Sequence, residues 1–464
     1  MALVSAPPQA RAERPGADVS EAGYPSPRRA WWSVFVLTAL YSLSLLDRHI
    51  IALLVHDIRA DLHISDFQMG LLQGVGFALF YVTFGLLFGW VIDRFSRRGV
   101  VFLGVTVWSL ATAACGLARN FGQLVGARFG VGAGEAALNP AAYSIISDTF
   151  PRRRLSLAIS VFGTGANLGG GLSLLLGGFL ITVLPKDGVT LPVLGHLQAW
   201  RVVFLAAGLP GLLIVLLIWT APDPRRRERL LGATSLRDTL AFVRGRWRFF
   251  SGHFLGFALL AASANGYQAW APTYLMREFG MPVTQVVSIL APISLLAGVT
   301  GSIFAGYVTD RWFARGRADA HLRFFIFATA VQLVGLCVAM TSRRLEVFVP
   351  FVIVAHLAGG FAGVAPAALQ LTTPNNYRGQ VSAAYLFVFN LVGMGLGPTM
   401  VGALTTWVFR DDAKVGWAVA TNSLIVLPLA IVAFACSLAP MRRAVAQASA
   451  WSVQDAPRAA RAVD

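Results

Sequence analysis

The sequence is short of charge, cysteine and lysine, and each shortage excludes a class of protein. Aspartate, glutamate, lysine and arginine make up 13% of the 464 residues, whereas soluble proteins average about 25%. The three cysteines, Cys115, Cys337 and Cys436, lie in separate apolar stretches, so they indicate neither a disulfide framework nor a metal site. The two lysines, Lys186 and Lys414, precede Asp and Val, so no Gly-Lys-Ser/Thr phosphate loop exists and ATP-driven chemistry is not expected.

Motifs of common enzymes are missing as well. The sequence has no His-Glu-x-x-His, and no Gly-x-Ser-x-Gly with partners in a strand context. The glycine-rich runs at 163–171 and 393–398 resemble dinucleotide loops, but both lie inside apolar stretches, where glycines favour close helix packing. We therefore expect neither an enzyme nor a bound cofactor.

Long apolar runs are what the sequence has in abundance. Hydrophobic residues make up 56% of it, and a run of about 20 apolar residues is long enough to cross a bilayer as a helix. The sequence predicts an all-α integral membrane protein with twelve transmembrane helices. The predicted spans are 31–55, 67–92, 99–118, 121–146, 155–184, 200–220, 249–275, 284–309, 322–341, 346–370, 379–408 and 415–439.

The net charge of +16 is concentrated in alternate loops. These loops hold about nineteen Lys and Arg residues against about eight in the opposite loops, which predicts both termini on the cytoplasmic side of the plasma (inner) membrane. The basic residues therefore indicate membrane topology, and nucleic acid is not an expected partner. They include Arg94, Arg97, Arg98, Arg152 to Arg154, Arg225 to Arg229, Arg248, Arg311, Arg315 and Arg317.

The chain repeats itself at about half its length. Gly89-Trp-Val-Ile-Asp93-Arg94 recurs as Gly306-Tyr-Val-Thr-Asp310-Arg311, and the run from Gly134 through Pro140 is echoed from Gly360 through Pro366. Because each half contains six predicted spans, an even number, the halves should lie parallel in the membrane. We predict halves at 31–220 and 249–440, a basic cytoplasmic linker at 221–248, and disordered tails at 1–30 and 441–464.

These features resemble the major facilitator superfamily over residues 31–440. The resemblance rests on Gly85-x3-Gly89-x3-Asp93-Arg94-x-Ser96-Arg97-Arg98, on its copy ending at Asp310-Arg311, and on the two halves. Within that superfamily, Leu46-Asp47-Arg48 with Gly126-Ala-Arg128 and Gly134-Glu135-Ala resembles the bacterial type of the spinster branch, whose eukaryotic members are linked to export of sphingosine phosphate and lysolipids. An Asp-Arg pair in the first span also occurs in sugar-acid and organic-anion symporters. The resemblance implies alternating access and a monomer.

Two pairs of charged residues lie inside apolar stretches, and such residues are functional candidates by default. Asp47 and Arg48 are in the first span, and Arg128 and Glu135 share one face of the fourth span because seven residues is close to two turns. We predict Asp47 and Glu135 as proton-coupling groups and Arg48 and Arg128 as ligands of an anionic headgroup. The alternative is a permanent salt-bridge scaffold.

The duplicated loop suggests a gate. An acid at a helix end followed by arginines can bridge to neighbouring helices and latch the cytoplasmic side of a transporter. The predicted gating residues are Asp93, Arg94, Arg98, Asp310 and Arg311. The alternative is that they serve only topology and structure.

The second half supplies polar and aromatic candidates for substrate contact: Asn265, Gln268, Trp270 and Asn390. His356 is interpreted as a satisfied core residue. Aligning the two halves sets Val354 opposite Arg128 and Phe361 opposite Glu135, so one wall of the cavity should be charged and the other apolar.

The predicted function is proton-coupled secondary transport of an amphipathic anion, such as a lysophospholipid or sphingoid phosphate. The partners are then the substrate, protons and membrane lipids. Sugar acids or other organic anions are the alternative substrates, and a membrane sensor without transport is the alternative from another class.

Overall fold

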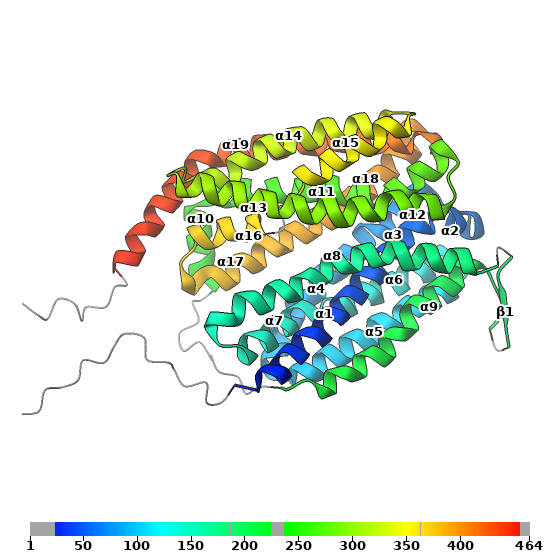
Figure 1. Ribbon diagram of the computed structural model, residues 1–464, viewed down its shortest axis with the longest axis horizontal. Helices are drawn as coiled ribbons and strands as arrows, with labels where there is room; N and C mark the ends of the chain where they lie inside the picture. The colour runs from blue at the N-terminus through cyan, green and yellow to red at the C-terminus, as the bar shows by residue number, and fades with distance from the viewer. Residues whose placement is uncertain (1–23, 186, 193, 224–235, 362, 455–464) are drawn as a thin grey trace, which may run out of the picture.

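The computed structural model describes residues 24–185, 187–192, 194–223, 236–361 and 363–454. The chain forms two stacked sets of helices whose axes run side by side, one set from the N-terminal half of the sequence and one from the C-terminal half (Figure 1). The first and last described residues leave the same end of the molecule, and a short hairpin marks the other end. The two sets correspond to the two halves of the sequence.

The N-terminal set begins with helix α1 and ends with η2. Its elements are α1 (Pro27–His49), η1 (Ile50–Leu53), α2 (Val55–Leu62), α3 (Asp66–Gln73), α4 (Val75–Arg94), α5 (Arg97–Leu117), α6 (Phe121–Glu135), α7 (Leu138–Thr149), α8 (Arg152–Val183), β1 (Val189–Leu191), β2 (Gly195–Leu197), α9 (Ala199–Ile214) and η2 (Val215–Thr220). The two strands pair antiparallel, with Val189 opposite Leu197.

The C-terminal set begins with a short amphipathic helix, α10. Its elements are α10 (Leu236–Gly245), α11 (Trp247–Phe279), α12 (Val283–Pro292), η3 (Ile293–Ala297), α13 (Gly298–Ala314), α14 (Ala320–Thr341), α15 (Leu345–Ala358), α16 (Val364–Thr372), α17 (Asn375–Val388), η4 (Phe389–Leu396), α18 (Gly397–Ala403), η5 (Leu404–Phe409), η6 (Asp412–Lys414) and α19 (Val415–Gln454). The segments η3, η4 and η5 are π-helical.

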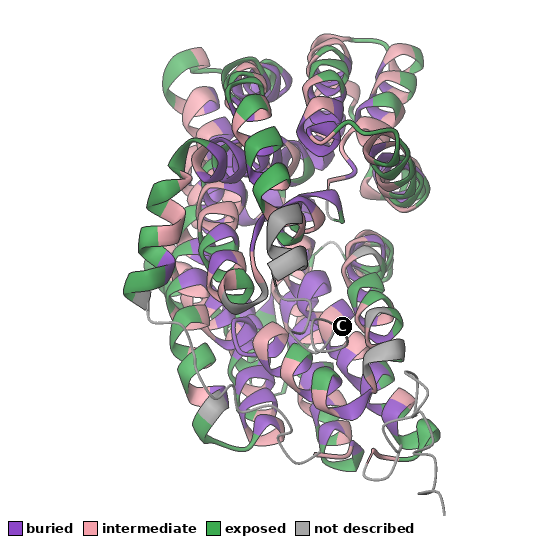
Figure 2. Ribbon diagram, turned by 90° about the vertical axis from the view of Figure 1, so that its left-hand side faces the viewer, coloured by how far each residue is buried: buried purple, intermediate pink, exposed green. Residues whose placement is uncertain are grey.

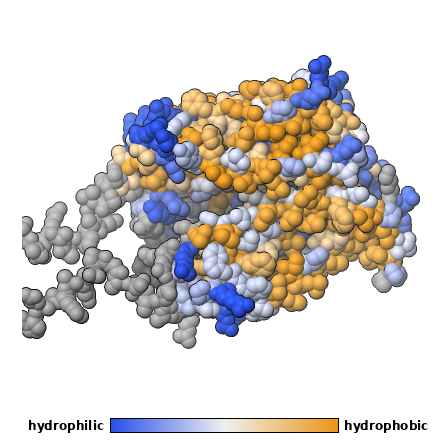
Figure 3. Space-filling model, in the orientation of Figure 1, coloured by the Kyte–Doolittle hydropathy of each residue, from blue (hydrophilic) through white to orange (hydrophobic). Residues whose placement is uncertain are grey.

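Nine helices within the described residues are long and apolar enough to cross a membrane. On the face shown in Figure 3, apolar side chains cover the middle of both sets and polar ones gather toward the ends. The other three predicted spans are helical as well: 121–146 is α6 and α7, 249–275 is within α11, and 346–370 is α15 and α16. The fold is therefore that of an all-helical membrane protein.

Two predicted disordered segments are partly helical. The C-terminal segment continues α19 without a break as far as Gln454, and Met441 within it is fully buried against the second set. At the other end α1 begins at Pro27, four residues before the predicted span, because a proline fits the first turn of a helix.

The linker 221–248 contains α10, whose apolar face the sequence analysis missed. Residues 1–23, 224–235 and 455–464 lie outside the described part of the chain.

Glycines allow the closest helix contacts, as predicted for the two glycine-rich runs. A Cβ atom on Gly169 of α8 would lie 2.4 Å from the Ser42 carbonyl oxygen of α1, and one on Gly397 would lie 2.1 Å from the Ala262 carbonyl oxygen of α11. Both distances are too short for any side chain. These glycines therefore set the spacing of helices within each half.

The two halves meet along several pairs of elements. Helix α3 packs on α18 and α4 on η4, α8 packs on α12 and η3, and η1 packs on α11. Viewed from the end where the termini leave, buried residues lie toward the inside of each set (Figure 2). The contacts between α3 and α18 lie far from the termini, near α2 and the hairpin.

Candidate functional site

An ion pair between the first and fourth predicted spans is the centre of the candidate site. Arg48, near the C-terminal end of α1, places its Nη2 atom 2.5 Å from Glu135 Oε2 at the end of α6. The Ser44 hydroxyl, one turn earlier on α1, donates to the same carboxylate oxygen at 2.7 Å. The Glu135 side chain is completely buried, and the Arg48 side chain is 15% exposed. Glu135 is thus held by one cation and one hydroxyl from α1.

Local sequence sets how α6 packs beside Glu135. The glycine before Glu135 lets α5 approach closely, since a Cβ on Gly134 would lie 2.6 Å from the Trp108 backbone nitrogen. Helix α6 ends at Glu135 and α7 begins at Leu138, so the carboxylate sits at a break in the fourth span. Interruptions of this kind are characteristic of binding sites in transporters.

Asp47 and Arg128 are the other members of the buried charge cluster. Asp47 is fully buried and accepts one hydrogen bond, from the Thr112 hydroxyl of α5 at 3.3 Å. It lies within electrostatic reach of Glu135 and Arg128. Arg128 is 1% exposed, and its Nε atom donates to the Leu72 carbonyl oxygen at 3.3 Å. The structure therefore brings all four predicted charges into one neutral cluster.

Several polar atoms of this cluster lack a partner. Among the described residues, no hydrogen-bonding atom is placed to pair with Asp47 Oδ1, Glu135 Oε1 or the two Nη atoms of Arg128. Nearly all buried polar groups in proteins are paired, so such atoms require a functional or solvent explanation. Two unpaired guanidinium nitrogens can bind the two oxygens of a carboxylate or phosphate at once.

Aromatic rings and a thioether surround the arginines. The guanidinium carbon of Arg48 lies 4.6 Å from the ring centre of Phe77 and 5.0 Å from that of Tyr81, both on α4, and that of Arg128 lies 5.2 Å from Phe77. Cation–π contacts of this kind stabilise a desolvated cation. The Nη1 atom of Arg48 also lies 3.9 Å from the sulfur of Met394 in η4. Arg48 therefore contacts both halves of the protein.

The predicted contacts in the second half are not equivalent. Gln268 is exposed, whereas Asn265 donates to the Ala261 carbonyl oxygen of its own helix at 2.9 Å and Asn390 lies in η4, half-buried. Trp270 is fully buried, and its indole nitrogen donates to the Pro398 carbonyl oxygen at 3.0 Å. This side chain packs α11 against α18.

Val354, Phe361 and His356 are the remaining candidates from the second half. Val354 is exposed, and Phe361 contacts Phe389 with ring centres 5.7 Å apart. His356 places Nδ1 3.0 Å from the Val352 carbonyl oxygen, one turn back on α15, and its ring meets that of Tyr267 edge-on.

The predicted gating residues make contacts within their own halves. The Arg94 guanidinium lies 3.9 Å from the ring centre of Trp90, and Arg311 donates to the Tyr307 hydroxyl at 3.2 Å. Arg98 lies 3.6 Å from the Asp223 carboxylate at the start of the linker. Asp310 is exposed at the end of α13, and the side chain of Asp93 lies outside the described part of the structure.

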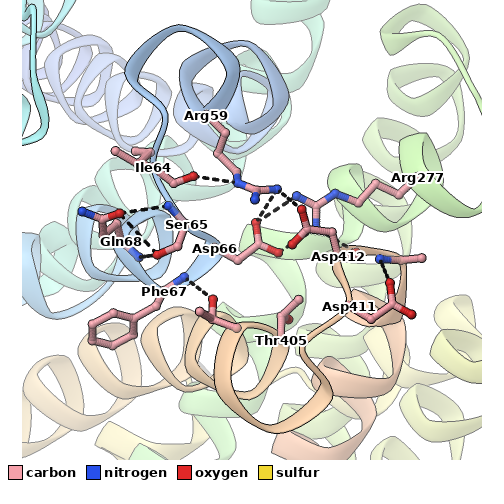
Figure 4. A network of polar contacts seen from close by, with 12 residues as sticks. Arg59, Ile64, Ser65, Asp66, Phe67, Gln68, Arg277, Thr405, Asp411 and Asp412 are labelled. Carbon is pink, nitrogen blue, oxygen red and sulfur yellow. Dashed lines mark hydrogen bonds and ion pairs between the residues drawn. The ribbon is translucent and has the colours of Figure 1, made fainter.

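A polar network that the sequence analysis missed joins the two halves at the opposite end (Figure 4). Asp66, the first residue of α3, is 1% exposed and binds Arg277 of α11 through both carboxylate oxygens, at 2.7 and 2.8 Å. Arg59 of α2 lies 3.1 Å from Asp66 and 2.8 Å from Asp412 of η6. Asp66 follows Ser65, whose capping box with Gln68 starts the helix. That capping signal was visible in the sequence, but the partners of Asp66 were not.

Two stacked helical sets that are apolar along their middle, with a neutral charge cluster buried within the first set, are typical of a membrane transport protein. The family model for the Major Facilitator Superfamily matches residues 37–398. The chain belongs to that superfamily, and its relatives include spinster proteins.

Two relatives match most of the length of this chain. An MFS-type efflux pump of Mycolicibacterium smegmatis is 28% identical over 400 residues, which cover 85% of this chain and 89% of that protein. Protein spinster of Drosophila melanogaster is 27% identical over 406 residues, which cover 83% of this chain and 64% of the longer fly protein. Members of this superfamily are transporters, so the expectation that the chain is not an enzyme is confirmed.

The fold has a solved counterpart. The crystal structure of a bacterial homologue of the human lysosomal transporter Spinster, in an inward-facing and unoccupied conformation, superposes with a TM-score of 0.77 at 23% identity. The alignment covers 91% of this chain and 98% of that one.

Proposed function

We propose that this protein is a secondary transporter that moves an amphipathic anion by alternating access and couples it to protons. It crosses the plasma membrane twelve times in two parallel six-helix repeats, with both termini and the linker in the cytoplasm. The monomer is the transport unit, because one chain supplies both halves around one cluster. The observation that carries the proposal is the neutral set of Asp47, Arg48, Arg128 and Glu135, in which Asp47, Arg128 and Glu135 are buried and Arg48 reaches Met394 of the second half.

The network around Asp66 supports an inward-facing state. By the distribution of arginines, the end that carries Arg94, Arg98 and Arg311 is cytoplasmic. Asp66 then latches the outer end, where it binds Arg59 and Arg277 from different halves. The cytoplasmic gating residues Arg94 and Arg311 bind within their own halves, which fits a cytoplasmic gate that has opened. In the outward-facing state we expect the ion pair between Asp66 and Arg277 to break and the cytoplasmic gating residues to form contacts between the two halves.

Arg128 is the proposed anion ligand. Its guanidinium is buried and anchored by a hydrogen bond from Nε to the Leu72 carbonyl oxygen, and within the described part of the chain its two Nη atoms have no partner. This geometry leaves the two-pronged side of the guanidinium for a carboxylate or phosphate. Arg48 is engaged by Glu135, so it can join the anion only when that ion pair loosens.

Asp47 is the proposed proton carrier, and Glu135 is the coupling partner. Glu135 Oε2 receives donors from Ser44 and Arg48, which favours its charge, whereas Asp47 accepts one longer bond from Thr112. A proton on Asp47 would change the charge of the cluster from neutral to positive. An anion bound by Arg128 would restore neutrality, so proton and anion would favour each other's binding.

The relatives' names support anionic substrates of two kinds. A relative from Xenopus tropicalis is named sphingosine-1-phosphate transporter SPNS2, and one from Escherichia coli is named probable L-galactonate transporter. The first substrate is an amphipathic phosphate and the second a sugar acid. We favour the amphipathic anion, because aligning the two halves sets the apolar residues Val354 and Phe361 in the positions that Arg128 and Glu135 occupy in the first half.

Uptake into proteoliposomes tests this proposal. Wild-type protein is reconstituted, and the movement of labelled lysophosphatidate and labelled galactonate is measured with and without a pH gradient. Gradient-dependent movement of lysophosphatidate supports the proposal. Movement of galactonate alone assigns the chain to the sugar-acid symporters, and binding of either without movement indicates a sensor.

A further inference from the structure

A second polar cavity lies inside the C-terminal half and belongs to no site described so far. It has a volume of about 250 Å³ and lies between α11, the η3–α13 segment, α14 and α15. Its polar lining consists of Tyr267, Gln268, Ser294, Ser302, Gln332 and His356. This volume is just below the range of about 300 to 1,000 Å³ that is usual for small-molecule sites.

The lining is uncharged, in contrast to the cluster in the N-terminal half. Hydroxyls, amides and one imidazole supply both donors and acceptors. In its neutral form His356 must donate from Nδ1 to the Val352 carbonyl oxygen, so Nε2 carries a lone pair that can accept a hydroxyl hydrogen. A site that offers donors and acceptors without charge suits hydroxyl groups, which use both.

Two buried groups of the cavity lack a protein partner. Tyr267 is 6% exposed and Gln332 is 4% exposed, yet among the described residues no group is placed to pair with the Tyr267 hydroxyl or with Gln332 Oε1. Gln268, in contrast, is exposed, so the cavity has an accessible side and a buried floor. Buried polar groups are paired as a rule, so a water cluster or a ligand must satisfy these two.

The internal repeat explains why a cavity exists here. Counting from Asp93-Arg94 and Asp310-Arg311, Phe77 and Tyr81 of α4 correspond in sequence to Ser294 and Gly298. In the first half those two rings fill the space beside Arg48. In the second half a small side chain and a glycine stand in their places, and the π-helical segment η3 passes along the same wall. Isolated π-helical turns often occur at functional sites.

We propose that this cavity binds an uncharged, hydroxyl-bearing group of the size of a cyclitol or sugar ring. Gln332 and Tyr267 bind its inner hydroxyls, and Gln268 and His356 bind those nearer the accessible side. If the bound group is part of a transported substrate, the inference rests on the proposed function: the anionic group of the substrate binds Arg128 and its hydroxylated portion binds the second half. Binding of the hydroxylated group by itself does not depend on transport.

Binding of a neutral probe separates the two claims. The full-length protein is placed in lipid nanodiscs, without alkyl glycoside detergents, because their sugar headgroups would compete for the cavity. Saturation-transfer NMR then measures the binding of myo-inositol. Cyclohexanol, which has a ring of the same size but one hydroxyl, is the comparison compound, and empty nanodiscs give the background signal.

The variants are Gln332→Leu, Gln268→Leu, Arg128→Gln in the charged cluster, and Gln285→Leu on the exposed surface of α12 as the matched control. Loss of one net hydrogen bond weakens binding by about 2- to 12-fold. In the wild type we expect a stronger signal from myo-inositol than from cyclohexanol. Binding of myo-inositol should weaken by about 2- to 12-fold in Gln332→Leu and Gln268→Leu. It should be unchanged in Arg128→Gln and Gln285→Leu. Thermal unfolding of each variant establishes that it is folded.

Equal signals for wild type and Gln332→Leu, or none above empty nanodiscs, would overturn the inference and leave a cavity that holds only water. Loss of the signal in Arg128→Gln would overturn it as well, because the probe would then bind at the charged cluster. A normal myo-inositol signal in a protein that transports no anion would leave the site standing and refute the proposed function alone.

Discussion

Asp66 and Arg277 form a two-pronged ion pair between α3 of the first half and α11 of the second, with N–O distances of 2.7 and 2.8 Å. The Asp66 side chain is fully buried, and Arg59 approaches it from the other side. A buried carboxylate with two cations cannot part from either without a new partner or water. This ion pair therefore holds α3 and α11 together, so this end of the molecule can open only when the two halves move apart there.

Asp66→Asn should release that end. Breaking a buried pair by removing one charge costs about 3 to 5 kcal/mol, which is enough to reverse a two-state preference. Spin labels at the exposed positions Ala60 and Lys414, in a Cys436→Ser background, would report the separation by pulsed electron resonance. We expect a longer distance to become populated in Asp66→Asn.

Glu278→Gln is the matched control, because Glu278 neighbours Arg277 but pairs with the exposed Arg343 within the same half. Its distance distribution should equal that of the wild type. A distribution in Asp66→Asn that is unchanged from the wild type would contradict the latch.

Arg128→Gln should weaken anion recognition. Hydrogen bonds to charged groups contribute about 1.5 to 3 kcal/mol, so the KM for a transported anion should rise by about 10- to 150-fold. The measurement is initial uptake into proteoliposomes over a range of substrate concentrations. Arg119→Gln, at an exposed position before the same helix, should leave KM unchanged. An unchanged KM in Arg128→Gln would assign Arg128 to the scaffold.

Trp270→Phe should affect stability and not substrate recognition. The change removes the indole donor to the Pro398 carbonyl oxygen and leaves a gap between α11 and α18. We expect a loss of about 1 to 3 kcal/mol from the unpaired carbonyl and the gap, seen as a lower Tm in a thermal unfolding assay. KM should stay within about twofold of wild type, since the change alters no group proposed to bind substrate. A rise in KM at normal Tm would restore the original assignment of Trp270 as a substrate contact.

Asp319 gives a pH-dependent prediction outside the membrane-spanning segments. Burial raises the pKa of its carboxyl, but hydrogen bonds and charges from Arg323, at 2.9 Å, and Arg442, at 2.7 Å, outweigh burial and lower the pKa below its ordinary value. A lowered folded-state pKa means that the stabilisation is complete above the unfolded value of about 4 and is lost as pH falls through the folded value.

Asp319→Asn should therefore lower Tm at pH 7, and the difference from wild type should shrink as pH falls below about 4. Asp187→Asn, at an exposed position, is the control at each pH. A Tm difference that grows in acid would show that the ion pairs with Arg323 and Arg442 do not stabilise the fold.

Local and compositional features of the fold were predictable, and contacts between distant segments were not. The predicted span 99–118 differs from α5 by two residues at its start and one at its end, because apolar length alone sets such limits. Helix periodicity predicted that Arg128 and Glu135 share one face of the fourth span, and the structure brings Arg48 of the first span to Glu135. The role of Asp66 was not predicted, since nothing in the local sequence indicates that Arg277, 211 residues away, would reach it.

The orientation of α11 is another feature that the sequence pattern does not supply. Gln268 and Trp270 both lie on this helix, but Gln268 is exposed and Trp270 is buried, with its indole nitrogen bonded to Pro398. Which side of α11 meets α18 depends on the close approach at Gly397, a tertiary contact that the sequence pattern does not contain. The polar cavity was missed for a similar reason, because its depth arises from the small residues Ser294 and Gly298 on another helix.

The central claim is that protons drive the transport of an anion through the Asp47 cluster, and proton flux measures this most directly. Wild type, Asp47→Asn and the surface control Asp187→Asn are reconstituted with a pH-sensitive dye inside the vesicles, and labelled lysophosphatidate is added. The account predicts anion-dependent acidification in wild type and Asp187→Asn, and none in Asp47→Asn, which should still bind the anion. Equal anion-driven proton movement in Asp47→Asn and wild type, or lysophosphatidate transport in wild type with no proton movement, would contradict it.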